Sequence, residues 1–475
     1  MKKSKPNPKA NKSILWFAYG VVALFLLMGA YMGYFIQAES EEVINNPYNS
    51  RLDSLSDRII RGKILSSDGT VLAETSVAED GSETRIYPYG ELFAHVVGYS
   101  TAGKTGIESL ANFYLLSSHV NLIEKTVNEL ADQKNIGDNV VTTLDLALQK
   151  TASDALGDNR GAVVAIEPST GKILAMVSKP AFDPNTVAAE WDSLVNGDSS
   201  EARLLNRATQ GLYPPGSTFK LLTALEYMRE HPGDYNDYTF SCDGIFEYEE
   251  FKIQCASQTA HGNVDFGLAF ADSCNGAFAN LGLSLDLNRL HSLSEELLYN
   301  KELPLSLPYN KSSFTMTDGA SDWEILQTSI GQGSTLMTPI HNAMLAAAIA
   351  NGGVLMKPYV LDHVENAGGQ VVKRFSPSEY GSLITEAEAG ALKDLMVRVV
   401  NEGTGSRVKS DAYQAAGKTG SAQFEAGKEA HAWFIGFAPA DDPKIAVCVI
   451  VEQGSSGGRV AAPIARQLFD CYLGQ

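Results

Sequence analysis

Cysteine is scarce in this sequence, and closely spaced pairs of metal-binding residues are missing. Five cysteines in 475 residues are too few for a fold held together by disulfides. The eight histidines and the cysteines form no H-x-x-x-H or C-x-x-C pair, so we expect no metal site and no cofactor. Cys242 and Cys255 could form a disulfide in an oxidising compartment, and Cys274 is expected to be a small packed side chain.

Basic residues are also in deficit, with 37 lysines and arginines against 56 acids and a net charge of −19. A protein this acidic repels nucleic acids and anionic lipid surfaces, so we exclude nucleic acid as a partner. The sequence has no repeat, heptad or low-complexity tract that would indicate a fibrous or disordered chain. Its length is typical of about two or three globular domains.

One long hydrophobic run stands near the N-terminus, where residues 14–36 contain no charge. As a helix this run would be about 34 Å long, enough to cross the ~30 Å core of a bilayer. Residues 1–13 hold lysines and no acid, which predicts a cytoplasmic N-terminus and an exported body. A cleaved signal peptide is the alternative, but its apolar core is usually ~7–15 residues long and ends at a small-x-small site. We therefore favour an uncleaved single-pass anchor.

Beyond this run the pattern changes several times. Residues 38–57 are polar and predict a tether, and short apolar runs over 61–116 favour strands and turns. Residues 121–139 predict one helix that ends in a polar loop, which is typical of a module boundary. A short strand that leads into an amphipathic helix is expected over 139–156.

The rest of the chain mixes helical and strand patterns. Residues 161–178 alternate around the turn PSTGK and predict a β-hairpin. Residues 220–230 and 342–353 have helical patterns, whereas residues 444–454 read as a strand. This mixture predicts a sheet covered by helices.

The tetrapeptide GKTG occurs twice, at residues 103–106 and 417–420. With Gly98, the first copy satisfies the phosphate-binding pattern G-x-x-x-x-G-K-S/T, and a helical pattern follows over 107–116. A nucleotide site would also need a strand that ends in a magnesium-binding aspartate, and no convincing one follows. An exported segment also meets little ATP. We therefore interpret the first copy as an accidental match.

A different chemistry is indicated by the stretch GLYPPGSTFKLL. Two prolines and Gly216 end the preceding element, and the apolar spacing beyond them predicts a helix that starts near Ser217. Ser217 and Lys220 then share one face of the first turn. A lysine there can remove the proton of the serine hydroxyl if burial or a second cation lowers its pKa. The unpaired N–H groups at the helix start suit an oxyanion.

The S-x-x-K pattern is weak by itself, because it begins at Ser169 and Ser406 as well as at Ser217. Ser169 falls in the predicted hairpin turn and Ser406 in a polar glycine-rich stretch, so the context selects Ser217. The pattern S-x-N occurs once, at Ser273 to Asn275. These two patterns are the first two of three elements that occur together in penicillin-binding proteins and serine β-lactamases.

The third element is K-T-G, and its second copy suits that role better than the first. Residues 413–424 read as a strand edge, where Gly417 and Gly420 allow a substrate or another backbone to come close. Lys418 would add a cation that faces the serine and lysine of the first element, and Thr419 would add a hydroxyl. All three elements are thus present in the expected order.

With these motifs, the sequence resembles the class B penicillin-binding proteins, the membrane-anchored D,D-transpeptidases of peptidoglycan synthesis. The likeness covers most of the exported part. The segments that carry it are RGKIL with DGTVLAE, HVVGY with GKTGIESLANFYL, GAVVAIEPSTGKILAMVSKPAFDPN, LLNRATQGLYPPGSTFK, IGQGSTLMTPIHNAMLAAAIANGG, AGKTGSAQ and HAWFIGFAPA.

The resemblance implies a mixed α/β fold, in which a transpeptidase domain with an antiparallel sheet flanked by helices follows a small β-rich module. It divides the chain into a cytoplasmic tail (1–13), an anchor (14–36), an N-terminal pedestal or linker module (37–150) and a penicillin-binding transpeptidase domain (151–475). The pedestal is too short to hold a glycosyltransferase as well, so the bifunctional class is not expected.

The resemblance also implies the chemistry. A serine attacks the D-Ala-D-Ala end of a stem peptide, an amine of a neighbouring stem peptide takes the acyl group, and β-lactams acylate the same serine. A membrane glycosyltransferase of the wall-synthesis complex is the implied protein partner. The implied catalytic residues are Ser217, Lys220, Ser273 and Asn275, and the implied substrate-binding residues are Lys418, Thr419, Gly420 and Ser421.

Two departures and three alternatives stay open. The family usually has an Asp-Arg pair where this chain has Ser66 and Ser67, which casts doubt on a pedestal contact. The residue after K-T-G is often Thr and here is Ser421, which keeps the hydroxyl. A D,D-carboxypeptidase or a β-lactamase would use the same motifs, and an inactive scaffold of a wall-synthesis complex is the non-enzymatic alternative.

Overall fold

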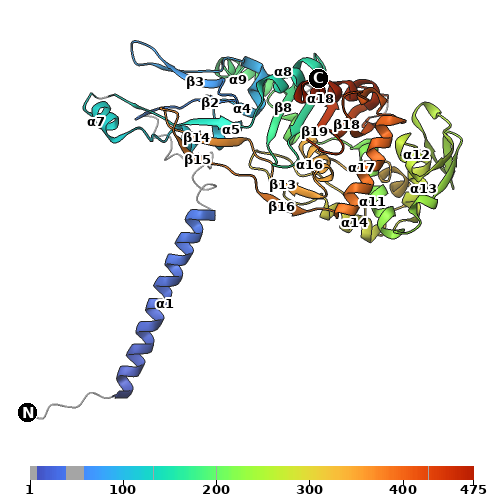
Figure 1. Cartoon of the computed structure of the whole chain (residues 1–475), viewed down its shortest axis with the longest axis horizontal. Coiled ribbons are helices and arrows are strands. Elements are labelled where there is room, and N and C mark those ends of the chain that lie inside the picture. The colour runs from blue at the N-terminus through green and yellow to red at the C-terminus, as the bar shows by residue number, and fades with distance from the viewer. Residues whose placement is uncertain (1–7, 39–57, 132, 199–200, 426) are drawn as a thin grey trace, which may run out of the picture.

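The computed structural model describes residues 8–38, 58–131, 133–198, 201–425 and 427–475. Its first element is the helix α1 (Pro8–Ala38), which stands apart from the folded body in Figure 1. Within α1, the segment Lys12–Ile36 is apolar and long enough to span a membrane. The predicted anchor is therefore a helix of suitable length and composition. The predicted tether after it lies outside the described residues.

A six-stranded sheet forms the centre of the N-terminal region, and two of its strands come from far along the chain. The strand order is β15-β14-β6-β2-β3-β4. β14 pairs with β6, where Val364 lies opposite Val140, so distant segments lie side by side (Figure 1). The bounds are β2 (Ile64–Leu65), β3 (Val71–Val77), β4 (Glu83–Ile86), β6 (Asn139–Thr142), β14 (Leu361–Glu365) and β15 (Val371–Arg374).

The strands and turns expected over 61–116 are present as far as β4, and the expectation is wrong beyond it. There the chain forms short helices, and Gly98 and Gly106 supply tight turns with φ of 83° and 55°. The helix predicted over 107–116 is divided at Ala111, whose φ and ψ of −102° and 12° are not helical. The elements are η1 (Gly90–Phe93), α4 (Ala94–Val97), α5 (Gly106–Leu110), α6 (Asn112–Leu115) and α7 (Leu122–Leu130), with β1 (Ile59–Ile60) paired to β5 (Asn135–Ile136).

Glu108 of α5 is fully buried and joins separate parts of the N-terminal region. Its carboxylate accepts hydrogen bonds from Nε of Arg61 and Nε of Arg85, each at 2.7 Å. Burial alone would raise the pKa of Glu108, but the two guanidinium groups hold it below its usual value. Ser66 instead donates to Asp68 in the turn after β2, so the departure at Ser66 does not touch this cluster.

A five-stranded antiparallel sheet is the centre of the larger region, with strand order β17-β18-β19-β7-β8. Most of its residues are buried, because both faces are covered. This explains why β18 and β19 are nearly continuous apolar runs and do not alternate with polar residues. The bounds are β7 (Gly161–Ile166), β8 (Ile173–Lys179), β17 (Ala416–Ala422), β18 (His431–Ala438) and β19 (Ile445–Val451).

Helices cover both faces of this sheet. Val164 of β7 belongs to the core under α16 (Pro339–Ala350), whereas its neighbour Val163 belongs to the core under α8 (Leu146–Leu156) and α18 (Ala462–Leu473). Successive side chains of a strand point to opposite faces, which gives the two cores. The mixed α/β fold with a flanked antiparallel sheet is therefore confirmed.

Several segments have the structure that their patterns predict. β7 and β8 form the hairpin expected over 161–178, and Gly171 turns it with φ of 81°. β6 leads into α8 as expected over 139–156, and α7 lies within the helix predicted over 121–139. The strand predicted over 444–454 is β19.

A helical lobe lies at the right-hand end of Figure 1, where α11, α12, α13, α14 and α17 are labelled. Its helices are α11 (Lys220–Glu230), α12 (Phe266–Ala271), α13 (Asn275–Ser284), α14 (Leu287–Glu296), α15 (Asp322–Thr328) and α17 (Glu386–Asn401). Small two-stranded sheets pair β9 (Thr239–Cys242) with β12 (Gly262–Asp265), β10 (Ile245–Tyr248) with β11 (Phe251–Gln254), and β13 (Val354–Met356) with β16 (Glu379–Ser382). The remaining short helices are α9 (Val187–Asn196), α10 (Arg207–Gln210), η2 (Gly216–Thr218), η3 (Tyr235–Asp237), η4 (Ala256–Gln258), η5 (Ser406–Val408) and η6 (Gly457–Ala461).

Candidate active site

Ser217 lies in the 3-10 turn η2, directly before the helix α11. The α-helix begins at Lys220, three residues later than Ser217, so the predicted start of the helix was slightly early. Gly216 has a φ of 55° and its N–H donates to the carbonyl of Gly331 at 2.8 Å. This turn places a partly exposed serine above a helix whose first residue is fully buried.

Lys220 is 0 % exposed and its ammonium is held by the S-x-N element. Its Nζ donates to the carbonyl of Ser273 at 2.7 Å, to Oδ1 of Asn275 at 2.7 Å and to the Ser273 hydroxyl at 3.3 Å. Burial lowers the pKa of Lys220 to about 8, and negative charge on the nearby Cys274 and Cys255 acts in the opposite direction. The amine is thus close to the protonation balance that a general base requires.

Lys418 approaches the same serine from the strand β17. It is also 0 % exposed, and its Nζ donates to the Ser273 hydroxyl at 2.8 Å. Burial and then the neighbouring ammonium of Lys220 hold the pKa of Lys418 well below its usual range. Ser273 itself has a positive φ of 56° between α12 and α13, which carries its hydroxyl between the two lysines.

Strand β17 comes unusually close to the serine turn. A Cβ on Gly216 would lie 2.9 Å from the carbonyl oxygen of Ser421, and a Cβ on Gly420 would lie 3.1 Å from the carbonyl oxygen of Pro215. Small residues at these two positions therefore allow the K-T-G strand and the nucleophile turn to form one wall. Ser421 itself is exposed at the edge of this wall.

The structure adds residues that the sequence motifs did not indicate. Thr404 shares a hydrogen bond of 2.6 Å between its hydroxyl and that of Thr419. Gln332 donates to the carbonyl of Ser421 at 3.3 Å from the loop that follows α15. Both residues stand in glycine-containing stretches, EGTGS and IGQGS, and the glycines were the available signal.

The other copies of the short motifs lie elsewhere. Gly103 to Gly106 form a loop and the start of α5 in the N-terminal region, and the segment before them is the helix α4, where a phosphate-binding loop needs a strand. A Cβ on Gly106 would lie 2.5 Å from the carbonyl oxygen of Val96, so this copy serves a tight turn. Ser169 lies in the β7–β8 turn and Ser406 in η5.

Comparison with known families matches this arrangement. The model of the penicillin binding protein transpeptidase domain matches residues 161–470, and the model of the penicillin binding protein A dimerisation domain matches residues 61–140. The first match spans more than half of the chain and contains every residue of the candidate site. The chain therefore belongs to the class B penicillin-binding proteins, as its motifs predicted.

Relatives and solved structures agree over nearly the whole length. The peptidoglycan D,D-transpeptidase PbpA of Mycolicibacterium smegmatis is 33 % identical, with 96 % of this chain and 98 % of the relative covered. The D,D-transpeptidase domain of a peptidoglycan glycosyltransferase from Eggerthella lenta superposes with a TM-score of 0.79 at 32 % identity, covering 88 % and 99 %. The ceftriaxone acyl-enzyme complex of penicillin-binding protein A from M. tuberculosis has a TM-score of 0.79 at 30 % identity, covering 89 % and 100 %.

Proposed function

We propose that this chain is a peptidoglycan D,D-transpeptidase that cross-links stem peptides through a serine acyl-enzyme. The observation that carries the proposal is the meeting of two buried lysines on the hydroxyl of Ser273, one from the helix after Ser217 and one from β17. Membership of the penicillin-binding family supports it, as do relatives that are D,D-transpeptidases or were solved as β-lactam acyl-enzymes. β-Lactams acylate the same serine and inhibit the enzyme.

Acylation begins at Ser217. Its hydroxyl attacks the carbonyl carbon between the two terminal D-alanines, and the neutral amine of Lys220 accepts the proton. The lowered pKa of Lys220 supports this role, because a base must be deprotonated near the working pH. Backbone N–H groups of Ser217 and Ser421 stabilise the oxyanion, an effect worth ~2.7–4 kcal/mol per donor.

The leaving group needs a proton when the C–N bond breaks. Ser273, bonded to both lysines, relays that proton to the amine of the departing D-alanine. Asn275 orients Lys220 and binds the backbone of the stem peptide. An amine of a neighbouring stem peptide then attacks the ester and displaces Ser217, which regains its proton.

The K-T-G strand binds the terminal carboxylate of the substrate. Lys418 supplies a positive charge and Thr419 a hydroxyl, while Gly420 leaves room for the peptide. A bound carboxylate would raise the pKa of Lys418 and favour its charged form. β-Lactams carry a carboxylate as well, so the K-T-G strand would bind both the stem peptide and the drug.

The expected placement in the cell follows from the lysines at the N-terminus. They keep that end in the cytoplasm, α1 crosses the membrane once, and the catalytic region faces the extracellular or periplasmic side. A membrane glycosyltransferase, which would make the glycan strands to be cross-linked, is the proposed partner. We also propose that the N-terminal pedestal or linker module ends near residue 150 and that the transpeptidase domain begins there.

Benzylpenicillin tests the assignment. The full chain, purified in detergent micelles, is mixed with the drug, intact mass is followed over time and the labelled peptide is mapped. We expect a long-lived adduct on Ser217 that is absent from Ser217→Ala. The matched control is Ser406→Ala, which removes the serine of another S-x-x-K pattern and should leave labelling intact. A stable adduct on the Ser217→Ala protein would reject the proposed nucleophile.

A donor stem peptide with and without an amine acceptor separates the alternatives. A transpeptidase forms the cross-linked product, whereas a D,D-carboxypeptidase releases D-alanine at the same rate without the acceptor. A β-lactamase hydrolyses the drug rapidly and keeps no adduct. If the protein reacts with neither the stem peptide nor the drug, the inactive scaffold of a wall-synthesis complex would be the favoured interpretation.

A further inference from the structure

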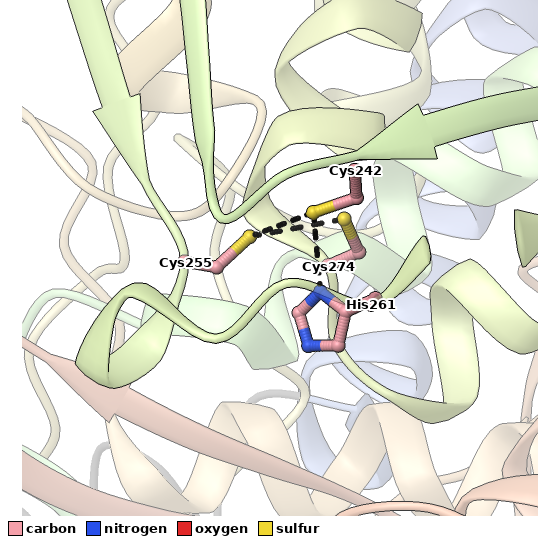
Figure 2. Close-up of side chains that lie close together, drawn as sticks. All are labelled: Cys242, Cys255, His261 and Cys274. Carbon is pink, nitrogen blue, oxygen red and sulfur yellow. Dashed lines mark hydrogen bonds between the residues drawn. The ribbon is translucent and has the colours of Figure 1, made fainter. Parts of the chain in front are cut away.

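Four side chains that are scattered in the sequence converge beside the S-x-N element. They are Cys242 at the end of β9, Cys255 after β11, His261 before β12 and Cys274 at the N-cap of α13. The three cysteines are buried and the histidine is half-buried. Figure 2 shows their sulfurs and the Nδ1 atom of His261 turned toward one another. All four candidate ligand atoms lie within 4.8 Å of one another.

The distances between the four ligand atoms fit tetrahedral coordination of one metal ion. The sulfurs of Cys242 and Cys255 are 3.6 Å apart, those of Cys255 and Cys274 are 3.8 Å apart, and Nδ1 of His261 is 3.3 Å from the sulfur of Cys242. Zinc bound to sulfur at ~2.3 Å and to imidazole at ~2.0–2.1 Å would place two sulfurs about 3.8 Å apart and sulfur and nitrogen about 3.5 Å apart. A disulfide requires ~2.05 Å between two sulfurs and would leave the third cysteine and the histidine unused.

We propose that Cys242, Cys255, His261 and Cys274 form a structural Zn²⁺ site that holds the S-x-N element in place. Three thiolates and one imidazole are a donor set typical of closed, four-coordinate zinc sites, and soft thiolates exclude Mg²⁺ and Ca²⁺. The expectation of no metal site rested on the lack of short-spaced ligand pairs. Here the ligands come from four separate elements, so no short motif exists.

The local fold has a reason to need such an ion. The ligands connect the two small sheets β9–β12 and β10–β11, and isolated two-stranded sheets are marginally stable in water. A metal that binds the folded form and not the unfolded chain adds its binding free energy to folding. The site would thus fasten both two-stranded sheets to the start of α13.

The same ion would position the catalytic groups on either side of it. Cys274 stands between Ser273 and Asn275, whose oxygens hold the ammonium of Lys220. The side-chain amide of Asn275 also donates to the carbonyl of Gln254 at 2.8 Å, one residue before the ligand Cys255. Asn275 is therefore fixed by the ligand-bearing segments on two sides, and loss of the ion would loosen its contact with Lys220.

Metal content tests the proposal without any substrate. The full chain in detergent micelles is dialysed with Zn²⁺ and then without it, and zinc is counted by mass spectrometry. We expect about one zinc per chain, and a 10–100-fold or greater loss of affinity in Cys255→Ser. The matched control is Cys448→Ala, which removes another buried cysteine, in β19 and outside the cluster, and should keep the zinc.

Two further measurements do not depend on a variant that could fail to fold. Cobalt(II) substituted into the wild-type chain should give thiolate charge-transfer bands and the strong visible bands of tetrahedral coordination. Removal of zinc with a chelator should slow acylation by benzylpenicillin, and Zn²⁺ but not Mg²⁺ should restore the rate. Less than about a tenth of a zinc per chain after dialysis, or a Cys242–Cys255 disulfide in the purified protein, would overturn the proposal. Acylation that is unaffected by zinc removal would reject the positioning role.

Discussion

Two clusters of buried charge among the described residues, one around Glu108 and one around Lys220 and Lys418, are arranged in opposite ways. In the N-terminal region, the carboxylate of Glu108 is neutralised by Arg61 and Arg85. In the candidate active site, Lys220 and Lys418 share one serine hydroxyl, and among the described residues no carboxylate forms an ion pair with either ammonium. The first cluster keeps its charges fixed, whereas the second favours loss of a proton.

The contrast separates structural charge from chemical charge. A buried ion with opposite charges around it stays ionised, because attraction offsets desolvation. A buried ammonium beside another ammonium has a lowered pKa and can act as a base at neutral pH. We therefore expect substitutions in the first cluster to change stability and those in the second to change reactivity.

The largest effect is expected from removal of the active-site lysines. Lys220→Met should reduce the rate of acylation by benzylpenicillin at least about a hundredfold, because a positioned general base contributes roughly 10²–10⁴-fold. Its free energy of unfolding should change by less than about 2 kcal/mol, since loss of an unpaired buried charge offsets loss of its hydrogen bonds. Intact mass and urea unfolding measure the two quantities. A near-normal acylation rate would remove Lys220 from the mechanism.

Glu108→Gln should show the reverse pattern. It leaves Arg61 and Arg85 without their buried counter-charge, which should lower the free energy of unfolding by about 3–5 kcal/mol. Acylation by the protein that remains folded should be unchanged. The control is Glu83→Gln, which alters a partly exposed pair with Lys134 and should cost no more than about 1 kcal/mol. Equal destabilisation by both variants would contradict the comparison.

The pH dependence of acylation should report the lowered pKa of Lys220. Its value of about 8 predicts a rate that rises about tenfold per pH unit below pH 8 and levels off above it. The free energy of unfolding should also depend on pH because of this lysine. In the unfolded chain its pKa is near ~10.4, so between pH 8 and that value the unfolded chain binds more protons than the folded protein. The free energy of unfolding should therefore increase as the pH rises from about 8 to ~10.4. A rate independent of pH between 6 and 8 would contradict this role.

The smallest effects should come from substitutions of residues outside the two clusters. Thr404→Val removes the hydroxyl that bonds to Thr419, and we expect a loss of a few-fold in acylation, consistent with about 1 kcal/mol for one hydrogen bond. Lys104→Ala alters the lysine of the first GKTG copy and should leave acylation unchanged. Stopped-flow acylation rates of the two variants measure both effects. A large loss of acylation rate in Lys104→Ala would indicate that the first GKTG copy takes part in catalysis.

Sequence patterns predicted the elements whose signal is local. The β7–β8 hairpin has a glycine turn between two apolar runs, and β17 has glycines where the backbone passes close to the serine turn. The helix boundaries were less accurate. The 3-10 turn at Gly216 delays α11, and the break at Ala111 depends on packing that no local pattern records.

Contacts between distant segments could not be predicted in the same way. Hydrogen bonds such as Thr404 to Thr419 and Gln332 to Ser421 depend on how loops fold over one another. The thiol–imidazole cluster is the extreme case, because its four members come from four elements with irregular spacing. The motifs predicted the candidate catalytic groups because those groups lie on short, regular stretches. Their assignment as catalytic residues stays a prediction until the acylation experiments are made.

The return of β14 and β15 to the N-terminal sheet joins the two regions at a second place, besides the chain that runs from β6 into α8. A protease cut near residue 150 would leave the pieces joined through the pairing of β14 with β6. Deletion of the N-terminal part would expose the edge of β14 and invite aggregation. Force applied to the N-terminal region would therefore reach the larger region by two routes, through the chain from β6 into α8 and through the ladder that joins β6 to β14.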